Sequence, residues 1–200
     1  MNYENTFNVM GNVDIYVIDQ ILKGRYKNGQ SILDAGCGKG RNLKWFYPND
    51  FELFGIDVDE GFLAFAKAEY PKYAKNFIAG NLDKLPYGQN SFDHILCCAV
   101  LHFAKSEIHF TAMFTALVRI LKPNGTLFIR MASNIGLDGN APDITYKENG
   151  QKSTYYLTRE RIRRLTNEFD IELIEPVKTT NVQDERAMTT LVLRKLELGR

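Results

Sequence analysis

Hydrophobic positions along this chain form short runs that alternate with segments of helical periodicity. The runs predict strands at 31–35, 51–57, 76–79, 92–98, 126–131, 170–175 and 187–195. The periodic segments predict helices at 12–23, 42–46, 60–69, 106–121 and 158–168. Ser106 and Thr158 are the expected caps of the last two helices. Residues 1–10 are polar and are expected to be irregular.

The order of these elements, strand followed by helix, predicts an α/β fold. Alternating strands and helices require a parallel sheet with right-handed crossovers and helices on both faces. The run at 92–98 does not alternate in polarity, which is typical of a strand covered on both sides. We therefore expect a Rossmann-like, doubly wound sheet of about seven strands, which binds ligands outside the carboxyl ends of its strands.

Length, charge and cysteine content narrow the class of protein. The 200 residues suit one domain, and a net charge of +1 without a basic run among aromatics disfavours a nucleic-acid partner. No apolar run approaches the ~20 residues of a membrane span, and the N-terminus lacks a signal-peptide pattern. We therefore expect a cytoplasmic protein that does not bind a membrane. The 3 cysteines suggest neither a disulfide nor a metal site. The sequence carries no signal of oligomeric state.

The most informative segment is the glycine-rich turn that follows the first predicted strand. Gly36, Gly38 and Gly40 lack the Cβ atoms that would keep a ligand away from the backbone. The next strand ends in Asp57, which places a carboxylate where it can accept hydrogen bonds from a ribose diol. Together these features indicate a cofactor that carries a nucleoside.

The residues around the turn favour a cationic cofactor over a dinucleotide. In the fingerprint G-x-G-x-x-G a third glycine packs the helix on the strand, and this chain has Arg41 at that position. Asp34 precedes the first glycine by two residues, where it would repel a pyrophosphate. The same carboxylate would attract the sulfonium and the α-ammonium of S-adenosylmethionine. A nicotinamide oxidoreductase is therefore the less favoured interpretation.

The motif Asp-x-Gly-x-Gly-x-Gly at 34–40 resembles the first motif of the class I S-adenosylmethionine-dependent methyltransferases, including those of type 11. Three later segments resemble further motifs of that family and occur in the expected order, at residues 80–87, 91–102 and 121–127. The resemblance is close over 30–133 and looser elsewhere. Gly-Arg-Asn at 40–42 is also similar to small-molecule methyltransferases of the tellurite-resistance type. The family implies the strand order 3-2-1-4-5-7-6, with an antiparallel last strand.

The resemblance implies S-adenosylmethionine as the cofactor and assigns contacts to its methionine part. The backbone of Gly36, Cys37 and Gly38 would lie along the methionine. Asp34 would act on the ammonium, directly or by orienting a water or a backbone group. Arg41 would pair with the cofactor carboxylate, as in the Gly-Arg-Asn relatives, or else be an exposed helix residue.

The adenosine part is assigned in the same way. Asp57 would hold the ribose hydroxyls, and Val58 would pack on one face of the adenine. Asn81, where the family often has aspartate, would bond the adenine amine through its side-chain oxygen. Leu82 would add a backbone contact, and Cys97 would lie near the cofactor by its position at a strand end.

Methyl transfer from a sulfonium is an in-line displacement in which the cofactor supplies the electrophile, so neither a metal nor a catalytic triad is expected. The acceptor is expected to be a small molecule, and the catalytic residue is unassigned. His102, which follows the fourth strand, is a candidate general base or else a packed side chain. His94 and His109 are expected to be structural.

The whole chain, 1–200, is expected to form a single methyltransferase domain. Residues 1–28 would cap the cofactor, and 134–157 would form a surface loop or a substrate-facing lid. Arg25 either reaches the ligand carboxylate or acts as a cation at a helix end. A second hypothesis is a protein of this fold that binds S-adenosylmethionine without transferring methyl, as a sensor or partner subunit.

Overall fold

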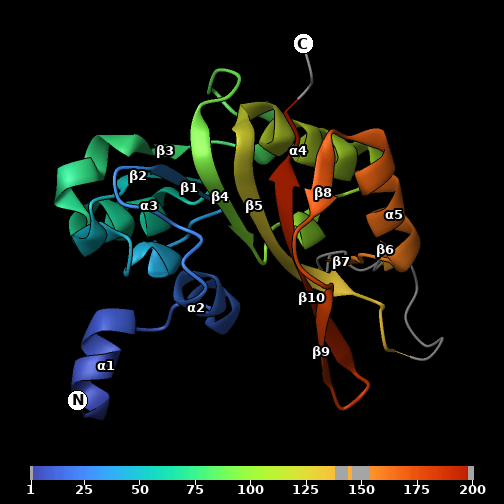
Figure 1. Ribbon diagram of the computed structural model, residues 1–200, viewed down its shortest axis with the longest axis horizontal. Coiled ribbons are helices and arrows are strands. Elements are labelled where there is room, and N and C mark those ends of the chain that lie inside the picture. Colours follow the sequence, from blue (N-terminus) through green and yellow to red (C-terminus); the bar gives the residue numbers. More distant parts are fainter. Residues whose placement is uncertain (1, 138–143, 146–153, 198–200) are drawn as a thin grey trace.

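The computed structural model describes residues 2–137, 144–145 and 154–197 and has an α/β architecture (Figure 1). Its helices are α1 (Tyr3–Met10), α2 (Ile15–Leu22), α3 (Glu60–Glu69), α4 (Glu107–Ile120) and α5 (Arg159–Glu168). Its strands are β1 (Ser31–Ala35), β2 (Glu52–Asp57), β3 (Phe77–Ala79), β4 (Phe92–Cys98), β5 (Leu121–Ser133), β6 (Ile144–Thr145), β7 (Thr154–Tyr155), β8 (Ile171–Leu173), β9 (Lys178–Val182) and β10 (Arg186–Lys195). Short 3₁₀ segments lie at Arg41–Leu43, Tyr47–Asn49, Pro71–Asn76, Leu82–Lys84 and Leu101–Phe103.

Most of the strands belong to one sheet, in the order β3-β2-β1-β4-β5-β10-β8, with β9 also paired to β10. The pairs from β3 to β5 are parallel, whereas β10 runs antiparallel to β5. With β8 as the sixth strand of the family order and β10 as the seventh, the implied order and the antiparallel last strand are confirmed. β6 and β7 pair separately from this sheet.

The predicted caps of two helices are confirmed. Ser106 Oγ accepts a hydrogen bond from His109 N (3.1 Å) at the start of α4. Thr158 Oγ1 accepts one from Arg161 N (3.0 Å) at the start of α5. Each cap satisfies a backbone donor that the first helical turn leaves without an intrahelical partner. β4 and α3 also have the bounds predicted for them, to within a residue.

The helix predicted at 42–46 is wrong, because only the 3₁₀ turn Arg41–Leu43 forms there. The preceding Gly40 is left-handed (φ 80°), and Pro48 follows so closely that few helical turns would fit. The chain instead bends so that Phe46 packs edge-on against Tyr26 and Phe51, with ring centroids 5.0 Å apart in both pairs. Aromatic packing therefore overrides the helical pattern.

Two further predictions failed at the chain ends. Residues 3–10 are helical rather than irregular, since Asn2 Oδ1 caps α1 by accepting from Asn5 N (3.0 Å). No residue of α1 is buried, although Tyr3 and Phe7 lie one helical turn apart and their rings stack with centroids 5.9 Å apart. β9 was missed because Lys178–Val182 is mostly polar, and its order comes from pairing with β10.

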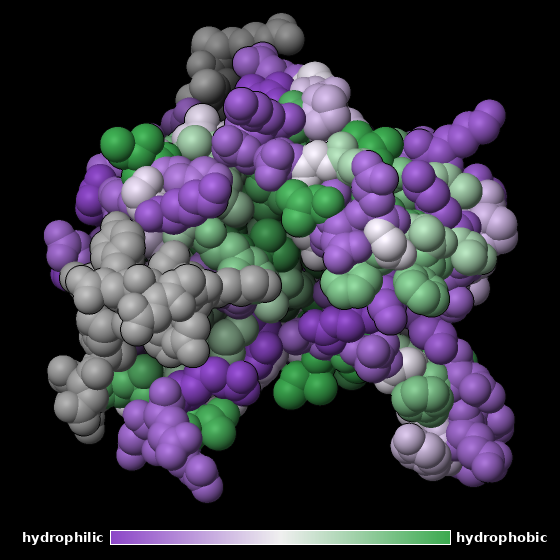
Figure 2. All heavy atoms as spheres, turned by 180° about the vertical axis from the view of Figure 1, so that it is seen from behind, coloured by the Kyte–Doolittle hydropathy of each residue, from purple (hydrophilic) through white to green (hydrophobic). Residues whose placement is uncertain are grey.

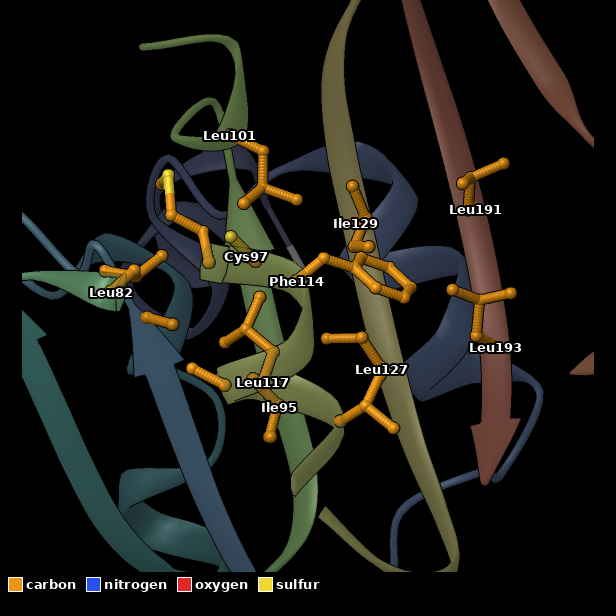
Figure 3. Packing of buried hydrophobic residues seen from close by; sticks show 14 of the residues in the cluster. Leu82, Ile95, Cys97, Leu101, Phe114, Leu117, Leu127, Ile129, Leu191 and Leu193 are labelled. Atoms are coloured by element: carbon orange, nitrogen blue, oxygen red, sulfur yellow. The ribbon is translucent and has the colours of Figure 1, made fainter. Parts of the chain in front are cut away.

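Hydrophobic side chains fill both faces of the sheet. On one face, α4 and α5 cover β1, β4, β5 and β10, and on the other lie α2 and α3. Figure 3 shows Phe114 and Leu117 of α4 against Ile95 and Leu127 of the sheet. Complete burial of one such side chain stabilises the fold by about 1.5–3 kcal/mol. The sheet is therefore held between two hydrophobic layers, one on each face.

The elements that flank the carboxyl ends of the parallel strands come from both ends of the chain. In Figure 1, α1, α2 and the β9–β10 hairpin lie at the end toward which β4 and β5 run. Seen from behind, the molecule is hollowed near its centre, and hydrophobic side chains gather in the hollow (Figure 2). Among the described helices, none is both long and apolar enough to cross a membrane.

Candidate functional site

The glycine-rich turn after β1 is joined to the end of β2 by hydrogen bonds. Gly36 N and Cys37 N both donate to Ile56 O, at 2.8 and 3.0 Å. Gly38 N donates to Asp57 Oδ2 at 2.7 Å. The two features that the sequence singled out, the turn and the acid of the next strand, therefore form one unit at the carboxyl edge of the sheet.

The glycines of this turn serve different purposes. A Cβ on Gly36 would overlap the side chain of Val100, and one on Gly40 would lie 2.6 Å from the ring of Tyr70. At Gly38 the nearest atom would be 4.0 Å away, on Phe62. The three glycines therefore differ in what a Cβ would displace. Gly36 and Gly40 admit neighbouring side chains, and Gly38 is the position with open space beside it.

Asp34 is a buried carboxylate whose partner is not supplied by the described part of the chain. Its side chain is 1% exposed, and neither Oδ1 nor Oδ2 has a hydrogen-bond partner among those residues. Burial raises the pKa of Asp34 to about 7, a shift opposed by the charge of Arg41 and reinforced by that of Asp57. A charge left unpaired in the interior is costly. The arrangement suits a ligand that brings a cation.

Asp57, Val58 and Asn81 lie at the carboxyl ends of the neighbouring parallel strands β2 and β3. Asp57 is half-buried, and its Oδ1 accepts a hydrogen bond from Asp59 N (3.0 Å). Gly80 N donates to Asp57 O (3.0 Å), which brings the loop after β3 beside the end of β2. The side chain of Val58 is 68% exposed, and Asn81 is exposed as well. These two side chains are therefore accessible to a ligand.

The side chains of Leu82 and Cys97, two predicted site residues, point into the core. Both side chains are buried in the hydrophobic core on the α4 face (Figure 3). Cys97 is 0% exposed, and burial raises the pKa of its thiol. Cys37 is buried on the opposite face, and its thiol pKa is likewise raised by burial. All of these side chains are therefore enclosed by the protein.

Two arginines considered for the ligand carboxylate have protein partners. Arg41 NH1 donates to Asn12 O (2.9 Å), so it ties the segment before α2 to the glycine turn. Arg41 is also exposed and begins the 3₁₀ turn Arg41–Leu43. Arg25 donates to Glu175 and Gln20, which indicates that it anchors the end of α2 rather than a ligand.

His102 has a defined hydrogen bond at the end of β5. Its Nδ1 accepts from Ala132 N (3.4 Å), and because a backbone amide only donates, the proton of the neutral ring is on Nε2. Burial lowers its pKa. His94 is structural, as expected: it bonds Thr126 and Gln30, and burial lowers its pKa to about 4.

A polar cluster that the sequence pattern does not predict lies under α2. Asp14 caps α2 by accepting from Tyr16 N (3.0 Å), and its Oδ2 lies 3.4 Å from Arg130 NH1 of β5. Arg130 interrupts the apolar run at 127–132 within β5, which was the available signal. Most of the predicted loop 134–157 lies outside the described residues. Its last part does not behave as a loop, because Tyr155 and Leu157 are 0% exposed.

Comparison with known proteins shows which family this chain resembles. Residues 33–129 match the family model described as methyltransferase domain. YqeM of Bacillus subtilis, whose name assigns it to the methyltransferases, is 27% identical over 126 residues. That match covers 62% of this chain and 51% of YqeM, so the chain spans about half the length of this curated relative.

Solved structures share the fold over nearly the whole chain. An S-adenosylmethionine-dependent methyltransferase from Clostridium acetobutylicum has a TM-score of 0.72 at 13% identity, covering 98% of both chains. A TehB-like S-adenosylmethionine-dependent methyltransferase from Corynebacterium glutamicum has a TM-score of 0.65 at 20% identity, covering 96% of this chain and 94% of its own. At these identities the likeness shows the fold, which is that of the class I enzymes.

Proposed function

We propose that this chain, which belongs to the methyltransferase family through residues 33–129, binds S-adenosylmethionine and transfers its methyl group to a small-molecule acceptor. The observation that carries the proposal is the buried carboxylate of Asp34, with both oxygens lacking a partner in the described part of the chain. It lies in the strand that leads into the turn where the backbone at Gly38 is open. A sulfonium and an ammonium satisfy this acid, whereas a pyrophosphate would be repelled by it.

The methionine part of the cofactor is assigned to the turn. It would lie along the backbone of Gly36, Cys37 and Gly38, with its ammonium at Asp34. Arg41 uses one donor on Asn12, and a guanidinium has five, so donors remain for the cofactor carboxylate.

The adenosine part is assigned to the ends of β2 and β3. Each oxygen of Asp57 accepts one backbone N–H and keeps a lone pair for a ribose hydroxyl. Val58 would pack on the adenine, and the exposed amide of Asn81 would accept from its amine. Leu82 and Cys97 would contribute through the backbone, since their side chains are in the core.

The bound cofactor supplies the electrophilic methyl group, and the residues of the chain hold the acceptor in line with it. Such positioning lowers the barrier by about 7–11 kcal/mol when the geometry is good. His102 presents a donor, Nε2–H, because its Nδ1 is occupied. We therefore propose that His102 orients the acceptor, and that the acceptor's nucleophile is anionic or gives its proton to water.

A small acceptor fits the surface and charge of the protein. The hydrophobic hollow in Figure 2 is the kind of concave apolar surface at which small molecules bind. The net charge of +1 does not provide the electrostatic footprint of a nucleic-acid partner. Cys37, Cys97 and Cys98 are free thiols, which fits a reducing compartment such as the cytoplasm.

Calorimetry with S-adenosylhomocysteine and NAD tests the proposal directly. The wild-type chain should bind the adenosyl ligand and not NAD, and the matched control D170A, an exposed acid remote from the turn, should bind alike. Binding of NAD alone would overturn the assignment. Labelled S-adenosylmethionine with a panel of thiols, amines and oxyanions then tests transfer. Tight binding without turnover across the panel would favour the non-catalytic hypothesis.

A further inference from the structure

The carboxyl end of β5 carries an arginine for which the proposed function has no use. Arg130 is in register with Cys98 of β4 and with Thr190 of β10. Register partners place their side chains on the same face of a sheet, and here it is the face that α2 covers. The guanidinium of Arg130 lies over the ring of Tyr16 in α2, 5.1 Å from its centroid.

Most donors of Arg130 are unused in the described structure. Its ion pair with Asp14, at 3.4 Å, is longer than the ~2.8 Å of a charge-assisted hydrogen bond. Its Nε is buried and has no hydrogen-bond partner among the described residues. Arg119 is also half-buried, yet it donates to Tyr87 O (2.7 Å) and Leu85 O (3.0 Å). Arg130 therefore differs from an arginine with a structural role.

A second polar atom without a partner lies in register with Arg130. The hydroxyl of Thr190 is buried and has no hydrogen-bond partner in the described part of the chain. Buried polar groups in folded proteins are nearly always hydrogen-bonded, so two in one row of a sheet need an explanation. A guanidinium N–H and a hydroxyl can both donate to one carboxylate.

The carboxylate of Asp14 lies between the guanidinium groups of Arg130 and Arg41 and makes no close ion pair with either of them. Its Oδ2 lies 3.4 Å from Arg130 and 3.9 Å from Arg41, and its side chain is only 7% exposed. Glu175 shows what a satisfied acid looks like, with Lys23 and Lys178 at 2.7 and 2.9 Å. The cluster under α2 therefore has two positive charges for one loosely held negative charge.

The cluster lies across β4 from Asp34. Asp34 is in register with Leu96, and Arg130 with Cys98, so both side chains share one face. Two strand spacings and two residues along the strand separate their Cα atoms by about 12 Å. An anion for an ammonium and a cation for a carboxylate thus lie on one face of the sheet, on either side of β4.

We propose that Arg130 and Thr190 form a carboxylate-binding subsite, and that Asp14 is an internal carboxylate which the ligand displaces from Arg130. The subsite deepens the proposed function and rests on it for its place beside the cofactor. The ligand's carboxylate belongs either to the amino-acid part of the cofactor or to the acceptor.

The experiment separates these two sources. Calorimetry measures S-adenosylhomocysteine and 5′-methylthioadenosine, which lacks the amino-acid part, on the wild type, R130Q and D14N. The control is R194Q, a β10 arginine paired with Glu172 on the exposed part of the strand. Benzoate and acetate are then titrated into each protein saturated with S-adenosylhomocysteine.

If the carboxylate belongs to the cofactor, R130Q lowers the affinity for S-adenosylhomocysteine at least about tenfold and leaves the affinity for 5′-methylthioadenosine unchanged. If it is the acceptor's, both nucleosides bind R130Q as before, and the carboxylate probes bind the wild type but not R130Q. In either case D14N removes the internal competitor and therefore increases the affinity for the carboxylate ligand. R194Q is expected to bind every ligand as the wild type does.

The proposal is overturned if R130Q binds S-adenosylhomocysteine normally and the saturated wild type binds neither benzoate nor acetate. Should R130Q fail to fold, the D14N variant is decisive. If D14N binds every carboxylate ligand with the affinity of the wild type, the proposal is also overturned. If the wild type binds neither nucleoside, the proposed function fails. The subsite is then tested separately, by carboxylate titration of the unliganded wild type and D14N.

Discussion

Asp34→Asn is predicted to stabilise the unliganded protein while it weakens cofactor binding. Burial raises the pKa of Asp34 from 3.8 to about 7. At 1.36 kcal/mol per pKa unit, ionised Asp34 costs the folded state about 4 kcal/mol at alkaline pH. The asparagine of D34N carries no charge but leaves a buried amide unpaired, which costs about 1–3 kcal/mol. The net gain for D34N is therefore about 1–3 kcal/mol.

The pH dependence of this gain has a definite sign. Because the folded-state pKa of Asp34 lies above its unfolded value, the folded state holds the proton more tightly. The cost is absent below pH ~4, grows as the pH rises, and is complete above pH ~7. D34N should therefore be no more stable than the wild type at pH 5 and more stable than the wild type at pH 8. The rise in Tm at pH 8 should be roughly 2–10 °C for a domain of this size.

Thermal unfolding of the unliganded proteins at pH 5, 6, 7 and 8 measures this effect. D93N is the matched control. Burial of Asp93 is outweighed by hydrogen bonds from Lys122 and Ser31, which lower its pKa, so D93N should be less stable than the wild type at pH 8. In calorimetry, D34N should lose about 1.5–3 kcal/mol of affinity for S-adenosylhomocysteine, and wild-type affinity should increase from pH 6 to 8. If D34N unfolds at a lower temperature than the wild type at pH 8, Asp34 has a partner in the protein and the reasoning fails.

Other changes should affect the cofactor site and the core separately. Asp57→Ala should weaken the binding of S-adenosylhomocysteine by about 1–3 kcal/mol in calorimetry, because the ribose hydroxyls lose their acceptor. Unchanged affinity would show that Asp57 is not part of the site. Gly38→Val should abolish binding while circular dichroism reports a largely intact fold, whereas normal binding would show that no ligand approaches the backbone there. Tyr155→Phe removes the 2.6 Å hydrogen bond to Glu107 and should lower the urea-measured stability by about 1 kcal/mol. Since Tyr155 packs against α4, a large loss of cofactor affinity in this variant would contradict its placement in the core.

The sheet and the glycine turn were predictable because local patterns encode them. The apolar runs and helical segments predicted a doubly wound sheet, and the resemblance supplied the antiparallel last strand. The helix at 42–46 was predicted wrongly because its outcome depends on where Phe46 packs, and Phe51 and Tyr26 are set by other elements. A pattern within one segment holds no information about packing of that kind.

The acidic end of the site was equally accessible from sequence, whereas the basic end was not. Asp34 and Asp57 follow hydrophobic runs at fixed spacing from the glycines, so their meeting follows from strand order. Arg130 is near Asp14 and Thr190 only because α2 and β10 lie on either side of it in space. More than a hundred residues separate Asp14 from Arg130, and no motif links them.

The match to the family model ends at Ile129, within β5, one residue before Arg130. The matched segment therefore ends inside a strand, and the last residues of that strand, Arg130 among them, lie beyond it. Recombination at that point would exchange Arg130 and the strands that follow it, and would leave the turn after β1 intact. Chimeras joined within β5 should remain folded only if the inward and outward alternation of the strand is preserved across the junction.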